Sequence, residues 1–213
     1  MSSLNYIPPL GFHFLTPFYD YICELDGWGS TLKKMVIDVA CVREDDQTLD
    51  VGCGTGTLAI EMKKQNPHTQ ITGIDPDKKA LSIAHNKMHL QNVDIKFVEG
   101  FSQELPFNTS SFDLVISTLI FHHLTTDTKI KSLKQIYRVL KKNGRFILAD
   151  FGKAQNNWIR IFYRIVTALP IAEASTLQDN IDGKLPYFIQ DAGFQVTTLR
   201  PAYRGIQFLL GIK

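Results

Sequence analysis

Cysteine is scarce in this sequence. Only Cys23, Cys41 and Cys53 occur among its 213 residues, and no Cys-x-x-Cys pair is present. This spacing supports neither a zinc knuckle nor a disulfide framework. Free thiols favour a reducing compartment, so we expect a cytoplasmic protein. An apolar run of about 18 residues and a basic N-terminal segment are also lacking, so we expect neither a membrane span nor a signal peptide.

A dominant charge of one sign is lacking too. The 23 Lys and Arg residues nearly balance the 21 Asp and Glu residues, which leaves a net charge of +2. Nothing in this balance favours a nucleic-acid partner, and we expect none. No internal repeat is evident. The hydrophobic share of 44% is ordinary for a globular domain, and the chain is long enough to bury a large core.

Apolar, β-branched runs alternate with helical patterns from residue 47 onward. The expected strands are "TLDVG", "QITGID", "IKFVEG", "FDLVISTLI" and "RFILADF". Helices are expected over residues 57–65, about 77–90 and about 127–140, with the "NG" pair at 143–144 ending the third. The alternation predicts a doubly wound parallel sheet, with the very apolar "FDLVISTLI" as a central strand. Such sheets bind ligands at the carboxyl ends of their strands.

The C-terminal part departs from this alternation. Residues 158–169, "WIRIFYRIVTAL", form a strongly amphipathic pattern, and a second helix near 185–192 is expected to end at Gly193. The strands "FQVTTLR" and "IQFLLGI" follow, and the short link between them predicts a hairpin. The expected fold is therefore α/β, a doubly wound seven-stranded sheet that is mostly parallel with an antiparallel C-terminal strand.

Three glycines follow the first strand in "LDVGCGTG", at positions 52, 54 and 56. Glycine is costly in an ordered chain unless close approach or a positive φ requires it, so a ligand is expected to approach this backbone. A dinucleotide-binding loop would need its third glycine at position 57, which is Thr57, and no Walker string occurs. These departures argue against a nicotinamide-dependent oxidoreductase and against a P-loop.

The second strand ends in "GIDPD", with Asp75 nineteen positions after Gly56. An acidic side chain at this edge can accept hydrogen bonds from vicinal ribose hydroxyls. Alternatively, Asp75, Pro76 and Asp77 form only a turn and a helix N-cap. We assign the cap to Asp77 and favour ligand binding for Asp75.

Several motifs in order resemble the class I S-adenosylmethionine-dependent methyltransferases. They are "LDVGCGTG", "GIDPD", "GFSQELPF", "SFDLVISTLIFHHL" and "RVLKKNGRFILAD". Within that class the chain is similar to the small-molecule group that includes ubiquinone/menaquinone C-methyltransferases and many sugar and natural-product O-methyltransferases. The resemblance covers about residues 45–152 strongly. It implies a Rossmann-like fold, S-adenosyl-L-methionine as the cofactor and a small-molecule methyl acceptor.

The resemblance also implies a set of cofactor-binding residues. The methionine moiety would lie at the first motif and at the Ser117 backbone, the ribose at the second motif, and the adenine at the third. Tyr19 in "FYDY" matches a tyrosine that reaches the cofactor in related proteins, although it could equally pack on the sheet. The residues implied are Tyr19, Asp50, Gly52, Cys53, Gly54, Gly56, Asp75, Pro76, Gly100, Phe101, Ser102 and Ser117.

Phe101 departs from the family pattern. The family usually has an acid there, which receives the adenine amino group. With Phe101 in its place, adenine would be held by apolar contact and by backbone N–H groups around Ser102. Phe101 could instead be plain core packing.

Methyl transfer from a sulfonium is an in-line displacement, and a base helps if the acceptor is a hydroxyl or an acidic C–H. His122 and His123 follow the fourth expected strand, and Asp150 ends the fifth. If these strands are neighbours, a histidine and a carboxylate converge, and the acid can orient the imidazole. We expect His122 to be the base because it is nearer the strand end. In the alternative, one histidine is structural and Asp150 caps a turn.

No metal is expected. His85 and His89 lie four residues apart on a helix, but no third ligand is evident. Methyltransferases that act on base or glutamine nitrogens typically carry an N/D-P-P-Y/F string after the fourth strand, and this chain has "STLI" there. A small molecule, methylated on oxygen or carbon, is therefore the expected acceptor. The alternative is a protein of the same fold that binds the cofactor without methyl transfer.

We expect one methyltransferase domain over residues 1–213. Its parts are a helical cap (1–46), a cofactor-binding core (47–152), a helical lid or insert (153–192) and a closing β-hairpin (193–213). The helix within 156–170 is expected to cover the acceptor, with Phe162 contacting it. Two other roles for this helix stay open, a homodimer interface and a helix lying on a membrane surface.

Overall fold

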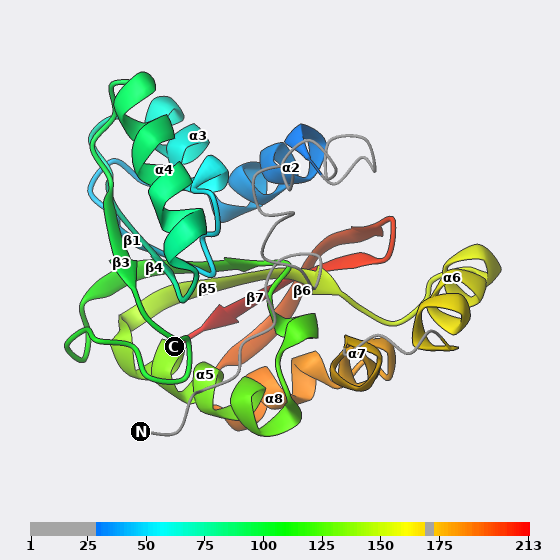
Figure 1. The fold of residues 1–213 in the computed structure, drawn as a ribbon. Helices are drawn as coiled ribbons and strands as arrows, with labels where there is room; N and C mark the ends of the chain where they lie inside the picture. The colour runs from blue at the N-terminus through cyan, green and yellow to red at the C-terminus, as the bar shows by residue number, and fades with distance from the viewer. Residues whose placement is uncertain (1–28, 169–172) are drawn as a thin grey trace, which may run out of the picture.

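A computed structural model describes residues 29–168 and 173–213, and the expected contacts of Tyr19 and of the Phe162 side chain lie outside its described part. Seven strands form one sheet, in the order β3-β2-β1-β4-β5-β7-β6 (Figure 1). The strands are β1 (Gln47–Val51), β2 (Gln70–Asp75), β3 (Lys96–Glu99), β4 (Phe112–Thr118), β5 (Leu140–Phe151), β6 (Gln195–Tyr203) and β7 (Ile206–Ile212).

The direction of the strands matches the expectation from the sequence. Strands β1 to β5 all pair in parallel with one another. Only β7 is reversed, and it pairs antiparallel with both β5 and β6. Strand β4 is central, and its residues alternate between two buried clusters, with Leu114 and Ile116 in one and Val115 in the other. The apolar "FDLVISTLI" run therefore reflects burial on both faces.

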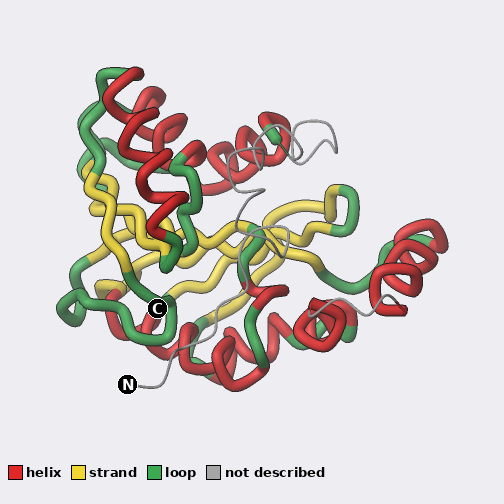
Figure 2. Tube along the Cα trace, in the orientation of Figure 1, coloured by secondary structure: helices red, strands yellow, loops and turns green. Residues whose placement is uncertain are grey.

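Helices cover both faces of the sheet (Figure 2). Leu32 and Met62, from helices of one face, belong to the same cluster as Leu114, whereas Leu133 and Leu185 belong to the cluster of Val115. The described helices are α2 (Ser30–Ala40), α3 (Thr57–Gln65), α4 (Lys78–Leu90), the 3₁₀ turn η3 (Phe121–His123), α5 (Thr126–Val139), α6 (Asn157–Ala168), α7 (Glu173–Ile181) and α8 (Leu185–Asp191).

Strand β5 begins earlier than expected, so the helix before it ends near the predicted residue but not because of the "NG" pair. Helix α5 stops at Val139, and Leu140 already pairs with Phe112 of β4. The "NG" pair therefore lies inside the strand as an irregularity. There the Asn143 N–H donates to the Lys213 carbonyl over 3.0 Å. This long-range pairing with the end of β7 outweighs the local turn signal.

The closing hairpin is tighter than expected. Tyr203 of β6 pairs with Ile206 of β7, so the turn consists of two residues, Arg204 and Gly205, both at positive φ. Such a turn suits the right-handed twist of a hairpin. Pro201 lies inside β6, where it is tolerated because β6 is the last strand of the sheet. Helix α7 was not anticipated as a separate element.

The register places the functional candidates at one edge. Val51, the last residue of β1, is level with Ser117 of β4, and Thr118 of β4 is level with Ala149 of β5. The carboxyl ends of β1, β2, β4 and β5 therefore lie along one edge of the sheet. Among the described helices, none is long and apolar enough to cross a membrane.

Candidate active site

The glycine loop follows β1 directly and is held by the end of β2. The N–H groups of Gly52 and Cys53 both donate to the Ile74 carbonyl, over 2.8 and 3.1 Å. Gly52, Gly54 and Gly56 all have positive φ, at 77°, 52° and 75°. A non-glycine residue is strained in this backbone region, so the loop conformation accounts in part for all three glycines.

The space around the three glycines differs. A Cβ atom on Gly52 would lie 2.3 Å from Cγ2 of Ile120, and one on Gly56 would lie 2.8 Å from Cβ of Ala84. A Cβ atom on Gly54 would meet nothing within 4 Å among the described atoms. Gly52 and Gly56 are therefore required by packing inside the protein. Gly54 alone presents its backbone to open space, where a ligand can approach.

Asp75 has a structural role in the loop. Its Oδ2 accepts from the Gly54 N–H and its Oδ1 from the Asp77 N–H, both over 2.9 Å. Burial is the largest influence on this carboxyl and raises its pKa to about 6, although the two amide donors act in the opposite direction. Asp77 caps α4 by accepting from Lys79 N–H over 2.8 Å, and the half-buried Pro76 lies between the two acids. Asp75 thus holds the turn, and its ribose role stays a prediction.

Asp50 is a buried acid with an oxygen that has no partner in the described part of the chain. It is 2% exposed, and no hydrogen bond to its Oδ2 is present among the described residues. Burial first, and then the nearby charge of Asp75, raise its pKa to about 7. The hydroxyl of Ser117 is also fully buried and without a hydrogen bond in the described part. Buried polar atoms of this kind are normally paired, so a donating ligand at this edge would complete both groups.

The third motif lies beside the loop. Gly100 N–H donates to the Asp75 carbonyl over 3.2 Å, and the Ser102 hydroxyl lies 2.7 Å from the Ser132 hydroxyl of α5. Phe101 is half-buried, and neither buried cluster of the described residues includes it. This weakens the alternative that Phe101 is core packing.

Cys53 lies in the glycine loop, and its pKa is raised mainly by burial of the thiol. Cys53 therefore acts as a small apolar group.

The chain turns sharply after β4 and touches the glycine loop. Leu119 has a φ of 56°, and its N–H donates to the Ala149 carbonyl of β5 over 2.9 Å. Ile120 comes next and occupies the space beside Gly52. The turn η3 then presents His122 and His123. The loop that carries the histidines is therefore packed directly against the glycine loop.

His122 and Asp150 form a buried pair. Nδ1 of His122 lies 2.8 Å from Oδ1 of Asp150, which is fully buried. The same carboxylate accepts from the N–H groups of Phe121, over 2.7 Å, and Phe151, over 2.8 Å. Asp150 also caps η3, so both readings from the sequence describe part of its role. An acceptor at this carboxylate requires a proton on Nδ1 of His122, which leaves the Nε2 lone pair available.

His123 is stacked on His122, with 3.9 Å between ring centroids, and the Phe151 ring meets His122 edge-on at 4.8 Å. His122 is thus fixed by a carboxylate and two rings. His85 is exposed and edge-on to Phe97, with 5.4 Å between centroids. In the described part of the chain, no group of three potential metal ligands occurs.

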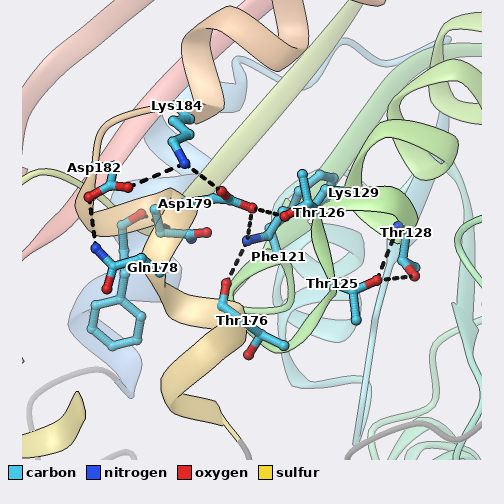
Figure 3. A network of polar contacts seen from close by, with 12 residues as sticks. Phe121, Thr125, Thr126, Thr128, Lys129, Thr176, Gln178, Asp179, Asp182 and Lys184 are labelled. Carbon is cyan, nitrogen blue, oxygen red and sulfur yellow. Dashed lines mark hydrogen bonds and ion pairs between the residues drawn. The ribbon is translucent and has the colours of Figure 1, made fainter. Parts of the chain in front are cut away.

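Asn180 of α7 was missed in the sequence. Its Nδ2 donates to Asp150 Oδ1 and to the Phe151 carbonyl, both over 3.2 Å, and the residue is fully buried. Its neighbour Asp179 belongs to a polar network with α5 (Figure 3). Asn180 lies in a helical stretch whose buried residues include polar ones. From the sequence alone, such a stretch resembles an exposed helix.

Helix α6 is attached beside this site. The Tyr163 hydroxyl lies 2.9 Å from the Gly152 carbonyl and 3.2 Å from that of Gly205, and burial raises its pKa to about 12. On the opposite side, Trp158 is 81% exposed and Ile161 is 49% exposed. The described side chains thus divide between the core and the surface, and the lid, dimer and membrane-surface roles all stay predictions.

Comparison with known proteins agrees with this architecture. A family model described as a methyltransferase domain matches residues 48–144. The demethylmenaquinone methyltransferase of Lactobacillus johnsonii is 31% identical over 195 residues, which cover 85% of this chain and 78% of that protein. The one from Thermus thermophilus is 29% identical over 156 residues, with 72% and 70% covered.

A solved structure extends the agreement to the fold. A SAM-dependent methyltransferase of Thermotoga maritima superposes with a TM-score of 0.63 at 20% identity, covering 94% of this chain and 99% of that one. The chain belongs to the S-adenosylmethionine-dependent methyltransferases.

Proposed function

We propose that this methyltransferase methylates an oxygen or an acidic carbon of a small, partly apolar acceptor of the hydroxylated-quinone class. The observation that carries this proposal is the His122–Asp150 pair. His122 follows Ile120 by two residues, and the Ile120 side chain packs against the glycine loop. This arrangement supports a general base beside the expected cofactor site. The relatives named as demethylmenaquinone methyltransferases support the acceptor class.

The residues at the end of β1 fit the cofactor. The amino group of S-adenosylmethionine is a cation with several donors, which suits the unpaired Oδ2 of Asp50 and the Ser117 region. The open space at Gly54 allows the ligand to approach the backbone. Asp75 would receive the ribose hydroxyls, and Gly100 to Ser102 would border the adenine. When bound, the cofactor supplies an electrophilic methyl group on a sulfonium.

His122 is the proposed general base. Its Nε2 would accept the proton of an acceptor hydroxyl or acidic C–H, and the imidazolium that forms would face the Asp150 carboxylate, 2.8 Å from Nδ1. A buried carboxylate stabilises this cation and keeps the ring in one tautomer. The contact of Nδ1 with the buried Asp150 carboxylate carries this choice, and the His123 ring stacks on His122 with 3.9 Å between the ring centroids. We therefore assign the base to His122 rather than to His123.

Replacing His122 by Gln tests this assignment. We expect kcat with a short-chain demethylmenaquinol to fall by about 10²–10⁴-fold, the usual contribution of general acid–base catalysis. Calorimetric affinity for S-adenosylhomocysteine should stay unchanged because the two sites use different residues. His123→Gln is the matched control and should keep most of the activity. Full turnover in the His122→Gln enzyme would contradict the base role, and no turnover of quinols by the wild type would contradict the acceptor class.

A further inference from the structure

We infer that Asn180 is a positioning residue for the His122–Asp150 pair. The inference rests on the proposed base role of His122, and its geometry can be tested separately. Helix α7 delivers the Asn180 amide to the Asp150 carboxylate, on which η3 and β5 also converge. Nδ2 lies 3.2 Å from Asp150 Oδ1 and 3.2 Å from the Phe151 carbonyl oxygen. Both partners are acceptors, so the NH₂ group must face them.

The Asp150 carboxylate accepts several hydrogen bonds. It receives the backbone N–H groups of Phe121 and Phe151, the Nδ1–H of His122 and the Asn180 amide. Three of these four donors share Oδ1. A carboxylate with this many donors cannot rotate without breaking several bonds. Asn180 thereby keeps Asp150 Oδ1 in the position in which it accepts from Nδ1 of His122.

Helix α7 is itself anchored, so the Asn180 amide has a defined place. The Thr126 hydroxyl donates to Asp179 Oδ2 over 2.6 Å, and Lys129 Nζ lies 3.4 Å from the same oxygen. Lys129 is fully buried and also donates to the Thr176 carbonyl over 2.6 Å. Lys184 Nζ donates to Asp179 Oδ1 over 3.1 Å (Figure 3). The contacts of Thr126 and Lys129 join α7 to α5, the helix that follows the two histidines.

Losing the Asn180 donor has a defined electrostatic sign. With one donor fewer, the Asp150 carboxylate is a stronger hydrogen-bond acceptor and holds the Nδ1 proton of His122 more tightly. The other titratable groups around the pair are His123 on η3, Lys129 on α5, Asp179 on α7 and Tyr163 on α6. None of them is changed by a substitution at Asn180.

Asn180→Leu isolates this donor. Leu has nearly the same size, and the Phe151 carbonyl keeps the Gln207 amide as a donor over 3.2 Å. Only Asp150 then loses a contact without replacement. Gln178→Leu is the matched control, because Gln178 is an exposed residue of the same helix whose amide bonds Asp182 rather than the pair.

The test is a ¹⁵N-histidine NMR titration of the cofactor-free protein, with the His122 signals assigned from His122→Gln. We expect Asn180→Leu to raise the proton affinity of His122 by about threefold, half a pH unit, and Gln178→Leu to leave it unchanged. The acid limb of kcat should move to higher pH by the same amount, with an unchanged KM for the cofactor. If Asn180→Leu does not fold, Asn180→Ala is titrated in its place.

An unchanged His122 titration and tautomer in the folded variant would overturn the positioning role, whatever the activity shows. Failure of the base assignment is distinguishable. It would appear as full turnover in His122→Gln, while the NMR titration would still report the Asn180 contact.

Discussion

Asp50 and Asp150 occupy the same place in two strands and have opposite surroundings. Each is the next-to-last residue of a buried strand, and each is almost completely shielded from solvent. Asp150 receives four donors from the protein. Asp50 Oδ2 receives none from the described residues, and burial raises its pKa to about 7. Among the described residues, the protein supplies donors to both oxygens of Asp150 and none to Oδ2 of Asp50, where we expect a ligand to supply one.

The two ends of this sheet edge therefore differ in how completely the protein satisfies their buried acids. The β4–β5 end is preorganised, because folding already fixes the orientation of His122. At the β1–β2 end, Asp50 has an oxygen without a hydrogen-bond partner among the described residues, and the nearby loop contains Gly54, which faces open space. A cationic ligand gains most where a buried anion lacks partners. We therefore expect substitutions at the first end to act on turnover and those at the second to act on cofactor affinity.

The largest effect on affinity is expected at Gly54. In Gly54→Val the side chain would fill the open space beside the loop, and S-adenosylhomocysteine affinity should fall about a hundredfold or more, equal to about 2.7 kcal/mol. Gly183→Val is the control, because Gly183 also has a positive φ, 74°, with its nearest neighbour at 3.6 Å, and lies between α7 and α8. Calorimetric titration of both folded variants decides the matter. Equal, wild-type affinity in both would show that the loop does not hold the cofactor.

A smaller loss is expected for Asp75→Ala. A charge-assisted hydrogen bond is worth about 1.5–3 kcal/mol, so the loss of one ribose bond should lower the affinity by about ten- to a hundredfold. Asp75 also holds the Gly54 N–H, and an analogue of S-adenosylhomocysteine without the two ribose hydroxyls separates these roles. If Asp75 binds the ribose, the substitution should weaken the analogue much less than the parent compound.

Asp77→Ala is the matched control for this experiment. It removes the N-cap of α4, which should cost about 1 kcal/mol of stability and leave the affinity unchanged. Equal weakening of the parent compound and the analogue by Asp75→Ala would restrict Asp75 to its structural role.

Much of the fold could be predicted because its signals are local. The helix over 57–65 and the central strand β4 follow directly from glycine spacing, apolar runs and periodicity. The pairing of His122 with Asp150 could be anticipated because His122 follows β4, Asp150 lies near the end of β5, and the two strands are parallel neighbours. The start of β5 could not, because it depends on the pairing of Leu140 with Phe112, 28 residues away.

Helix α7 was hidden for a different reason. The described residues on its buried side include Thr176, Asp179 and Asn180, which are polar. A helix whose buried residues are polar lacks the amphipathic pattern by which helices are recognised. The contacts that justify these residues, with Lys129 and Asp150, span 30 to 50 positions in the sequence. Polar positioning residues are therefore the part of such a site that periodicity conceals.

The smallest effect concerns stability and pH, and it tests the contrast between the two acids directly. The pKa of Asp50 is about 7 in the folded protein and about 3.9 in an unfolded chain. Between these values the folded state binds more protons, so its stability falls as pH rises. From pH 5.5 to pH 8 the contribution of Asp50 should amount to about 2 kcal/mol, a shift of about 4–8 °C in Tm.

Asp50→Asn should remove this contribution, so the cofactor-free variant should melt higher than the wild type at pH 8 and bind S-adenosylhomocysteine more weakly. Asp150→Asn should do the opposite and melt lower at pH 8, because an amide cannot accept from all four donors. Scanning calorimetry of the three proteins at pH 5.5 and pH 8 measures both effects, and the difference from the wild type cancels the other titrating groups. A lower Tm for Asp50→Asn at pH 8 would mean that Asp50 is already completed by the protein, and the contrast between the two carboxylates would not hold.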